Sequence, residues 1–165
     1  MSAGSVHRYT ARLIWEGNLG KGTSEYAGYS RRFRVSLDNK PDLSGSADPA
    51  FRGEADRHNP EDLLVASLSA CHMLSYLALC ARKGITVVDY TDEAHGVMNV
   101  FPDGGGRFES VTLHPRVTVT DAAMESPAMD LHESAHALCF IAGSCNFPVY
   151  NLPTVAVAQR KADDR

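Results

Sequence analysis

The segment NPEDLLVASLSACHMLSYLALCARKG, residues 59–84, predicts a long helix with well-marked ends. Asn59 is a favoured N-cap residue, and Pro60 is favoured at the first helical position because its missing N–H would have no partner there. Two acids follow, near the positive end of the helix dipole, and two cations stand in the last turn before Gly84. We therefore expect a helix from about Pro60 to Lys83, which at about 1.5 Å per residue spans on the order of 36 Å.

This predicted helix is apolar on nearly all sides. The stretch from Leu63 to Ala81 holds no charged residue and is long enough to cross a bilayer. Three serines, a histidine and a tyrosine interrupt it, and no other segment is hydrophobic enough to accompany it, so we expect no membrane span. A helix of this kind is expected to be central, covered by a sheet on one side and by another subunit or helix on the other.

Alternating apolar and polar residues predict strands on both sides of the helix. The pattern occurs at residues 8–16, an extended segment follows through Tyr26 and Tyr29, and the alternation returns at residues 33–37. Residues 38–58 are rich in Asp, Pro, Gly and Ser without periodicity, and this long loop is a candidate site. The second half predicts a hairpin (86–101 and 108–120, with a turn at 102–106), a second helix opened by Ser126 and Pro127 that ends near Cys139 or Phe140, a last strand (154–159) and a charged tail (160–165).

Together these elements predict an α+β fold, with antiparallel sheets packed around the long central helix and the second helix. A length of 165 residues is typical of one globular unit, so we assign residues 1–165 to a single domain. Apolar residues make up 44% and charged residues 22%, which excludes disorder. The net charge of -4 gives no electrostatic reason for a nucleic-acid or anionic-membrane partner, and the opening residues show no secretory signal, so we expect a cytoplasmic protein.

Four cysteines are too few for a disulfide scaffold, so each thiol is a packing residue, a metal ligand or a catalyst. Cys71 lies about twelve residues into the helix, where the helix dipole no longer acts on it, so a reactive Cys71 needs a nearby cation. Otherwise it is a small buried hydrophobe. His72 is not that cation, because neighbours at i+1 point about 100° apart around a helix. Cys80, nine residues on, lies on the opposite face and is expected to be a packing residue.

The second helix places His132, His136 and Cys139 within about 40° of one face. Residues 132–136 also match H-E-x-x-H, in which two histidines bind zinc and the glutamate, here Glu133, is the general base. A catalytic zinc needs a third protein ligand, and no Glu or His follows His136. A zinc protease is therefore disfavoured, as is a structural zinc held by Cys139 and one histidine. We expect a solvent-facing helix surface and no metal.

Several motifs are shared with a known family. NPEDLL at 59–64 is followed by Ala66, Ala70 and Cys71, AHALC stands at 135–139, and WEG at 15–17 with GKGT at 20–23 looks like an opening hairpin. With these motifs the chain resembles, over nearly its whole length, the OsmC/Ohr family of organic hydroperoxide reductases. The resemblance implies an intertwined homodimer whose two long helices pack centrally. FIAG at 140–143, and His72 in place of a more usual aromatic residue, imply a divergent OsmC-like subgroup.

The resemblance also implies roles for individual residues. Cys71 matches the peroxidatic cysteine, Cys139 the resolving cysteine and Glu61 the family's acid. The family's arginine matches Arg52 in the segment FRGE, and Arg57 and Arg32 are the alternatives.

The implied reaction is the reduction of organic hydroperoxides to alcohols. An arginine held by Glu61 would stabilise the Cys71 thiolate, whose attack on the peroxide gives a sulfenic acid, and a second thiol condenses with that acid to a disulfide. Cys139 is the expected second thiol, and Cys145, otherwise structural, is its substitute. By family analogy an external dithiol, a lipoylated protein, then reduces the disulfide, and no nucleotide, flavin or other cofactor is expected. The competing hypothesis is a binding module for an apolar small molecule that has lost turnover.

The spacing of Glu61 and Cys71 bears on the oligomeric state. Ten residues apart on one straight helix, they are separated by about 15 Å along the axis and about 80° around it, so they cannot meet within one chain. Either the helix starts later than its caps suggest, or a partner subunit supplies the acid across a two-fold interface. We therefore expect a homodimer with composite sites.

Overall fold

The computed structural model describes residues 4–159. Contacts within the chain divide it into two compact units, with the boundary between Leu63 and Leu64. The single domain expected over residues 1–165 stays a prediction. The predicted charged tail at 160–165 lies outside the described residues.

The first unit carries a three-stranded antiparallel sheet with the strand order β1-β2-β3. The strand predicted at 8–16 is only four residues long, and its apolar side chains find little cover: Tyr9 is 91% and Leu13 68% exposed. The extended segment predicted at Tyr26 and Tyr29 is wrong, since this stretch consists of turns. The elements are β1 (Arg12–Trp15), β2 (Phe33–Ser36), β3 (Leu43–Gly45) and the 3-10 helix η1 (Pro49–Phe51).

The segment at 38–58 is not the structureless loop that its composition predicted. It contains β3, which pairs with β2, and η1, which Asp48 caps by accepting a hydrogen bond from the Ala50 backbone N–H at 2.7 Å. Gly53 is required next to η1, because a Cβ there would collide with the Ala47 carbonyl oxygen. Short polar side chains thus order this segment through local hydrogen bonds, which hydrophobic periodicity does not reveal.

The long helix α1 (Pro60–Arg82) confirms the prediction from its caps. The Asn59 side chain accepts a hydrogen bond from the Asp62 backbone N–H at 2.7 Å, as an N-cap does. By length and composition alone α1 is able to cross a bilayer, and 22% of its apolar 18-residue stretch is buried by the chain. Two lines of residues at i, i+4 spacing define its sides: a buried inner face (Leu68, His72, Tyr76, Cys80) and an exposed outer face (Ala66, Ala70, Leu74, Ala78).

Each of the two long strands predicted at 86–101 and 108–120 is split between two sheets. The break falls where the Asp92 carboxylate accepts the His114 backbone N–H at 2.7 Å, and where Pro115, which has no N–H, begins a new strand. The second unit therefore has the sheets β4-β7-β9 and β5-β6-β8. Their strands are β4 (Val87–Asp92), β5 (His95–Val100), β6 (Gly106–Leu113), β7 (Pro115–Val119), β8 (Val149–Asn151) and β9 (Thr154–Val157).

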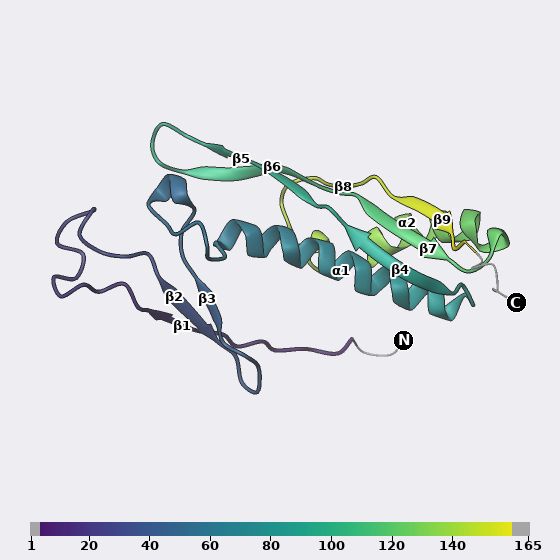
Figure 1. Cartoon of the computed structure of the whole chain (residues 1–165), viewed down its shortest axis with the longest axis horizontal. Helices are drawn as coiled ribbons and strands as arrows, with labels where there is room; N and C mark the ends of the chain where they lie inside the picture. Colours follow the sequence, from purple (N-terminus) through teal and green to yellow (C-terminus); the bar gives the residue numbers. More distant parts are fainter. Residues whose placement is uncertain (1–3, 160–165) are drawn as a thin grey trace, which may run out of the picture. The chain divides into compact units, whose positions relative to one another are not determined.

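The two sheets are mixed rather than antiparallel throughout. The hairpin of β5 and β6 lies where the turn predicted it, but β8 adds to β6 and β9 adds to β7 in parallel. β8 was missed by the sequence analysis because three residues are too few to show a period. Figure 1 shows α1 lying along the strands of the second unit.

The core of the second unit forms two clusters on the inner face of α1. One joins Leu68 to the buried residues of β6, and the other joins Tyr76 and Cys80 to β7 and to Ala128 and Ala135 of the second helix, α2 (Glu125–Leu138). The expected packing role of Cys80, which is 1% exposed, is confirmed. The inner face thereby sets the distance between α1, the sheets and α2.

Candidate functional site

The structure brings Cys71 and Cys139 together. Cys71 lies midway along α1 and is half-buried, and Cys139 is the C-cap residue of α2 and is 3% exposed. The Cys71 side chain lies close enough to Cys139 to raise the pKa of the Cys139 thiol, and both thiols are free. Two free thiols that lie close together on different helices are candidates for a disulfide.

The two thiols have different surroundings. Burial raises the pKa of the Cys139 thiol to about 11; the Ala142 backbone N–H, which donates to Sγ at 3.5 Å, opposes this rise, and the contact with Cys71 adds to it. Cys139 is therefore a protonated thiol at neutral pH. Because the thiolate is the attacking form, Cys139 is unsuited to react first with a peroxide.

Cys145 lies in the same part of the second unit. It is half-buried against the cluster of Leu68, Val111 and Leu113, and burial raises the pKa of its thiol. Its role as a substitute for Cys139 stays a prediction.

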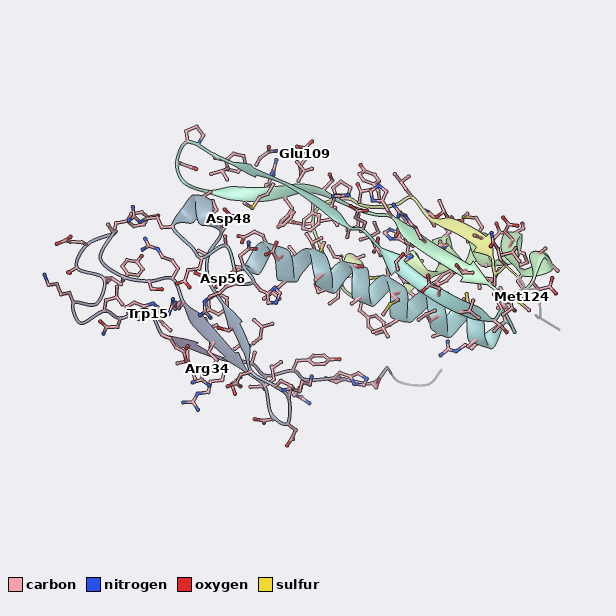
Figure 2. All side chains as sticks on the ribbon, in the orientation of Figure 1. Trp15, Arg34, Asp48, Asp56, Glu109 and Met124 are labelled. Carbon is pink, nitrogen blue, oxygen red and sulfur yellow. The ribbon has the colours of Figure 1, made fainter. Side chains whose placement is uncertain are left out.

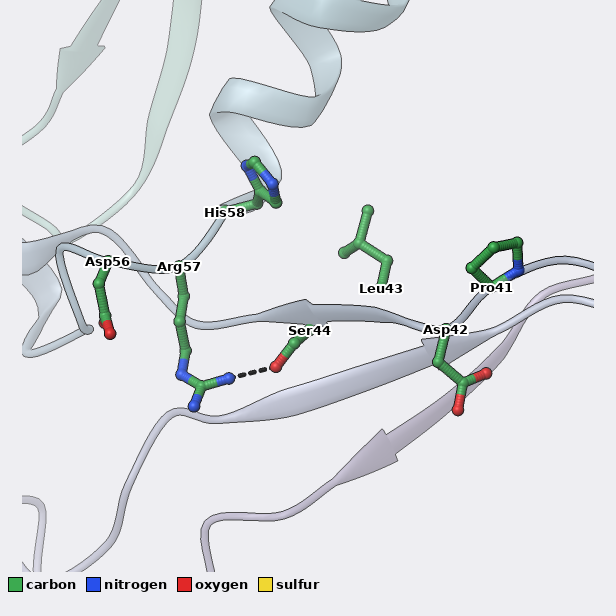
Figure 3. A pocket seen from close by; sticks show the side chains of 7 residues that line it. All are labelled: Pro41, Asp42, Leu43, Ser44, Asp56, Arg57 and His58. Atoms are coloured by element: carbon green, nitrogen blue, oxygen red, sulfur yellow. Dashed lines mark hydrogen bonds between the residues drawn. The ribbon is translucent and has the colours of Figure 1, made fainter.

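Two of the three arginines singled out from the sequence are tied to one carboxylate. Arg32 binds Glu54 at 2.6 Å and Arg57 binds Glu54 at 2.9 Å, and the hydrogen bond from Arg32 lowers the pKa of Glu54 to about 2. Arg57 also donates to the Ser44 hydroxyl at the wall of an open cleft of about 570 Å³, as Figure 3 shows. These guanidinium groups are thus engaged within the first unit.

Arg52, the arginine preferred from the sequence, has a different setting. It is exposed, adopts a left-handed backbone with φ 65°, and closes η1 through its backbone N–H to the Pro49 carbonyl. Among the described residues its side chain has no ion pair or hydrogen bond. The catalytic role proposed for Arg52 stays a prediction.

Sequence reasoning missed Arg31. Its guanidinium donates to the backbone carbonyls of Tyr26 and Tyr29, each at 2.6 Å, and lies 4.6 and 4.0 Å from the centroids of their rings. Carbonyl groups and aromatic faces hold the cation without neutralising it. The signal in the sequence is the pair of tyrosines that precedes Arg31 by two and five residues.

Arg31 and Glu61 line the same pocket of the first unit. The pocket has a volume of about 350 Å³ and mainly apolar walls, to which Trp15, at the end of β1 in Figure 2, contributes an aromatic side chain. It therefore combines a free cation, an acid and an apolar surface. Its lining residues are Leu13, Trp15, Tyr29, Arg31, Phe33, Ser46, Ala47, Asp48, Phe51, Pro60 and Glu61.

The histidine face of α2 is not the solvent-facing surface expected from the sequence. His132 is 3% exposed and His72 of α1 is 1% exposed, and His72 Nε2 lies 3.0 Å from His132 Nδ1. The Tyr76 ring stacks on the His132 ring with centroids 3.9 Å apart. The expectation was wrong because a helical period groups residues on a face but does not say whether another element covers that face. The small Ala128 and Ala135 on either side of His132 were the available signal.

The H-E-x-x-H match does not form a metal centre in the part of the chain described. Instead of facing a common ion with His132, His136 is half-buried and its Nδ1 accepts a hydrogen bond from the Asn151 side-chain amide at 2.9 Å. No group of three or more His, Cys, Asp or Glu side chains between residues 4 and 159 is placed to hold a metal ion.

A family model described as OsmC-like protein matches residues 53–149, which is more than half of the chain. The chain belongs to the OsmC-like family. Solved members share its fold: an OsmC-like protein of unknown function from Vibrio cholerae is 27% identical, with a TM-score of 0.79 over 90% of this chain and 99% of that one.

Other relatives of this OsmC-like protein extend the comparison. An organic hydroperoxide resistance protein from Elizabethkingia anophelis is 22% identical, with a TM-score of 0.66 over 94% of this chain and 100% of that one. The uncharacterized protein YmaD of Bacillus subtilis is 24% identical over 135 residues, 81% of this chain and 78% of YmaD. The α+β fold and the OsmC/Ohr resemblance are thus confirmed, and the family includes proteins named for organic hydroperoxide resistance.

The buried imidazole pair predicts how stability depends on pH. Burial lowers the pKa of both His72 and His132 to about 4, below about 6.5 in the unfolded chain. The folded state then binds fewer protons than the unfolded state between these values, so stability is complete above pH 6.5 and falls as the pH drops toward 4. We expect a loss of about 3 kcal/mol from each of the two histidines.

Urea unfolding at pH 7 and at pH 4.5 measures this loss. The double variant His72→Gln/His132→Asn keeps a neutral hydrogen bond and is expected to lose much less stability over the same range. A wild-type protein that loses no more than this variant would contradict the assignment.

Proposed function

We propose that this OsmC-like protein is a cysteine-based peroxidase that reduces organic hydroperoxides to alcohols. The Cys71 thiolate attacks a peroxide oxygen; an S–O bond forms, the O–O bond breaks, and the departing alkoxide takes a proton to become the alcohol. Cys139 then attacks the sulfenic sulfur; an S–S bond forms and hydroxide leaves as water with the proton that Cys139 releases. An external dithiol, by family analogy on a lipoylated protein, returns the disulfide to two thiols.

The observation that carries this proposal is the contact between Cys71 and Cys139 across α1 and α2. The high pKa of Cys139 supports its assignment as the resolving thiol, because a protonated thiol next to Cys71 does not compete for the peroxide. The names of several structural relatives point to the same chemistry. A compartment that keeps thiols reduced suits the cycle, so we propose a cytoplasmic location, with neither a nucleic acid nor a membrane as partner.

We expect the substitution Cys139→Ser to separate the two steps. The first attack at Cys71 continues, turnover stops, and Cys71 is overoxidised to sulfinic acid because its sulfenic acid has no partner. Mass spectrometry of Cys71 and a coupled peroxidase assay measure both effects. Cys80→Ser serves as the control for a thiol outside the pair, and sustained cycling of Cys139→Ser would show that another thiol, such as Cys145, resolves.

The activating cation is expected to be an arginine of the first unit. Arg31 shares a pocket with Glu61 and carries an unneutralised charge, which supports it alongside the original candidate Arg52. Arg32 and Arg57 are less suitable because Glu54 already neutralises them.

The arginine variants rank these candidates. Arg31→Gln is expected to slow the reaction of Cys71 with cumene hydroperoxide at least a hundredfold and to raise the pKa of the Cys71 thiol, because the thiolate loses its counterion. Arg52→Gln tests the other candidate: if Arg31 is the activating cation, this substitution changes the rate by less than about threefold. Stopped-flow rates from pH 5 to 9 measure both the rate and the pKa. A larger effect of Arg52→Gln than of Arg31→Gln would identify Arg52 as the activating cation.

The alternative function is the binding of an apolar small molecule without turnover. The aromatic walls of the pocket of about 350 Å³ favour it. Titration of free thiols after addition of one equivalent of cumene hydroperoxide, beside hydrogen peroxide, distinguishes the two functions. Rapid loss of two free thiols supports the peroxidase. An unchanged number of free thiols contradicts the peroxidase and favours the binding module.

We further propose that the active unit is a homodimer with composite sites. α1 begins at Pro60, so Glu61 and Cys71 share one continuous helix and lie about 15 Å apart along it. A second copy that supplies Glu61 removes this difficulty. The outer face of α1, made of three alanines and Leu74, is apolar and open to an identical helix, which would cover a surface that a monomer leaves exposed.

Mixing two inactive variants tests the composite site. Glu61→Ala and Cys71→Ser proteins are each expected to be inactive, and a heterodimer formed by subunit exchange is expected to regain activity at the one site that keeps both residues. Labelled subunits confirm the exchange. A mixture that stays inactive after confirmed exchange, or an enzyme that remains monomeric while active, refutes the arrangement.

A further inference from the structure

We infer that the buried pair of His72 and His132 is a clamp that holds the Cys139 thiol against Cys71 and that opens on protonation. The inference rests on the thiol pair of the proposed function, and it assigns both imidazoles as positioning residues. Neither ring needs to touch a substrate for the clamp to act.

Contacts between the two helices run in opposite directions along the chain. Cys71 meets Cys139, and further along α1 Tyr76 meets His132, which comes earlier in α2. His72 follows Cys71 directly, and His132 precedes Cys139 by seven residues, about 10 Å along a helix. The imidazole pair is therefore the polar contact between α1 and α2 that lies nearest the thiol pair along α1.

The contact between the rings is specific to neutral imidazoles. At 3.0 Å, His72 Nε2 and His132 Nδ1 share one proton, so one nitrogen donates and the other accepts. When both rings are protonated, two N–H groups face each other and the contact breaks. The outer nitrogens, His72 Nδ1 and His132 Nε2, are buried and have no hydrogen-bond partner among the described residues, so nothing there stabilises added charge.

The other ionisable groups around the pair leave it neutral at pH 7. Tyr76 of α1 is buried and Tyr90 of β4 is half-buried, and burial raises the pKa of both phenols. Asp92 of β4 favours the charged form of His72, whereas His136 of α2 and, above all, burial disfavour it. A charge at His132 is disfavoured by burial and by His72. Acid is therefore the condition that opens the clamp.

Loss of the clamp acts on the thiols through geometry. A disulfide forms only when the two Cα atoms lie within about 4.4–6.8 Å, so a small shift of α2 against α1 lowers the effective concentration of the pair. Cys139 is sensitive to such a shift because it stands at the very end of α2. The intrinsic reactivity of Cys71 is expected to be unaffected.

Equilibrium with reduced and oxidised glutathione measures the effective concentration without any peroxide. The Cys71–Cys139 disulfide is quantified by acid quench, alkylation and peptide mapping at pH 7. We expect His72→Leu to lower the equilibrium constant at least tenfold, and His72→Gln, whose amide replaces Nε2, to stay within threefold of wild type. His95→Gln, on the exposed part of β5, is the matched control with no expected change.

The pH profile separates a clamp from a residue that merely fills space. The equilibrium constant for forming the Cys71–Cys139 disulfide is measured at pH 7 and at pH 4.5, with a diselenide catalyst to speed exchange. We expect this constant to fall at least tenfold in the wild-type protein and less than threefold in His72→Gln/His132→Asn. If His72→Leu does not fold, this comparison carries the test. A folded His72→Leu with an unchanged constant, or a double variant as acid-sensitive as wild type, overturns the clamp.

This test is independent of the proposed enzyme activity. If the thiols do not react with hydroperoxide but the glutathione equilibrium changes as expected, the peroxidase proposal is contradicted and the clamp is supported. If the protein is an active peroxidase but the thiol–disulfide equilibrium is unchanged in the His72 variants, the clamp is contradicted and the peroxidase proposal is supported.

Discussion

Burial of the inner face of α1 is the constraint on which the second unit depends. Leu68 anchors β6 and its neighbours, whereas Tyr76 and Cys80 anchor β7 and the second helix. One helix thus provides a common wall for two separate sheets, which explains why both long strand segments bend between sheets rather than continuing straight. The outer face of the same helix, which carries three alanines and Leu74, is exposed within the single chain.

A single physical effect, desolvation, controls both the thiols and the imidazoles. Removing the charged form from water raises the pKa of Cys139 and lowers the pKa of His72 and His132. All three groups are therefore neutral at pH 7, although they are acids and bases of different strength. A neutral interior lets α1 and α2 approach closely, and it makes the approach sensitive to any added proton.

Charge is distributed differently in the first unit. Glu54 collects Arg32 and Arg57 into an ion-pair network that orders the segment leading to α1. Arg31 is held instead by carbonyl groups and tyrosine rings, so its positive charge is not neutralised by these partners. Structural and available cations can be told apart in this way, by the partner that holds each one, although all three are arginines.

The sequence by itself determined α1, the hairpin of β5 and β6, and the membership of the family, because caps, turn residues and the motifs at Glu61, Cys71 and Cys139 are local signals. Tertiary structure alone decided the rest. The parallel addition of β8 and β9, the burial of His132 and the setting of Arg31 depend on which surfaces cover one another. A period of 3.6 or 2 groups residues on a face, but the element that covers the face comes from distant parts of the chain.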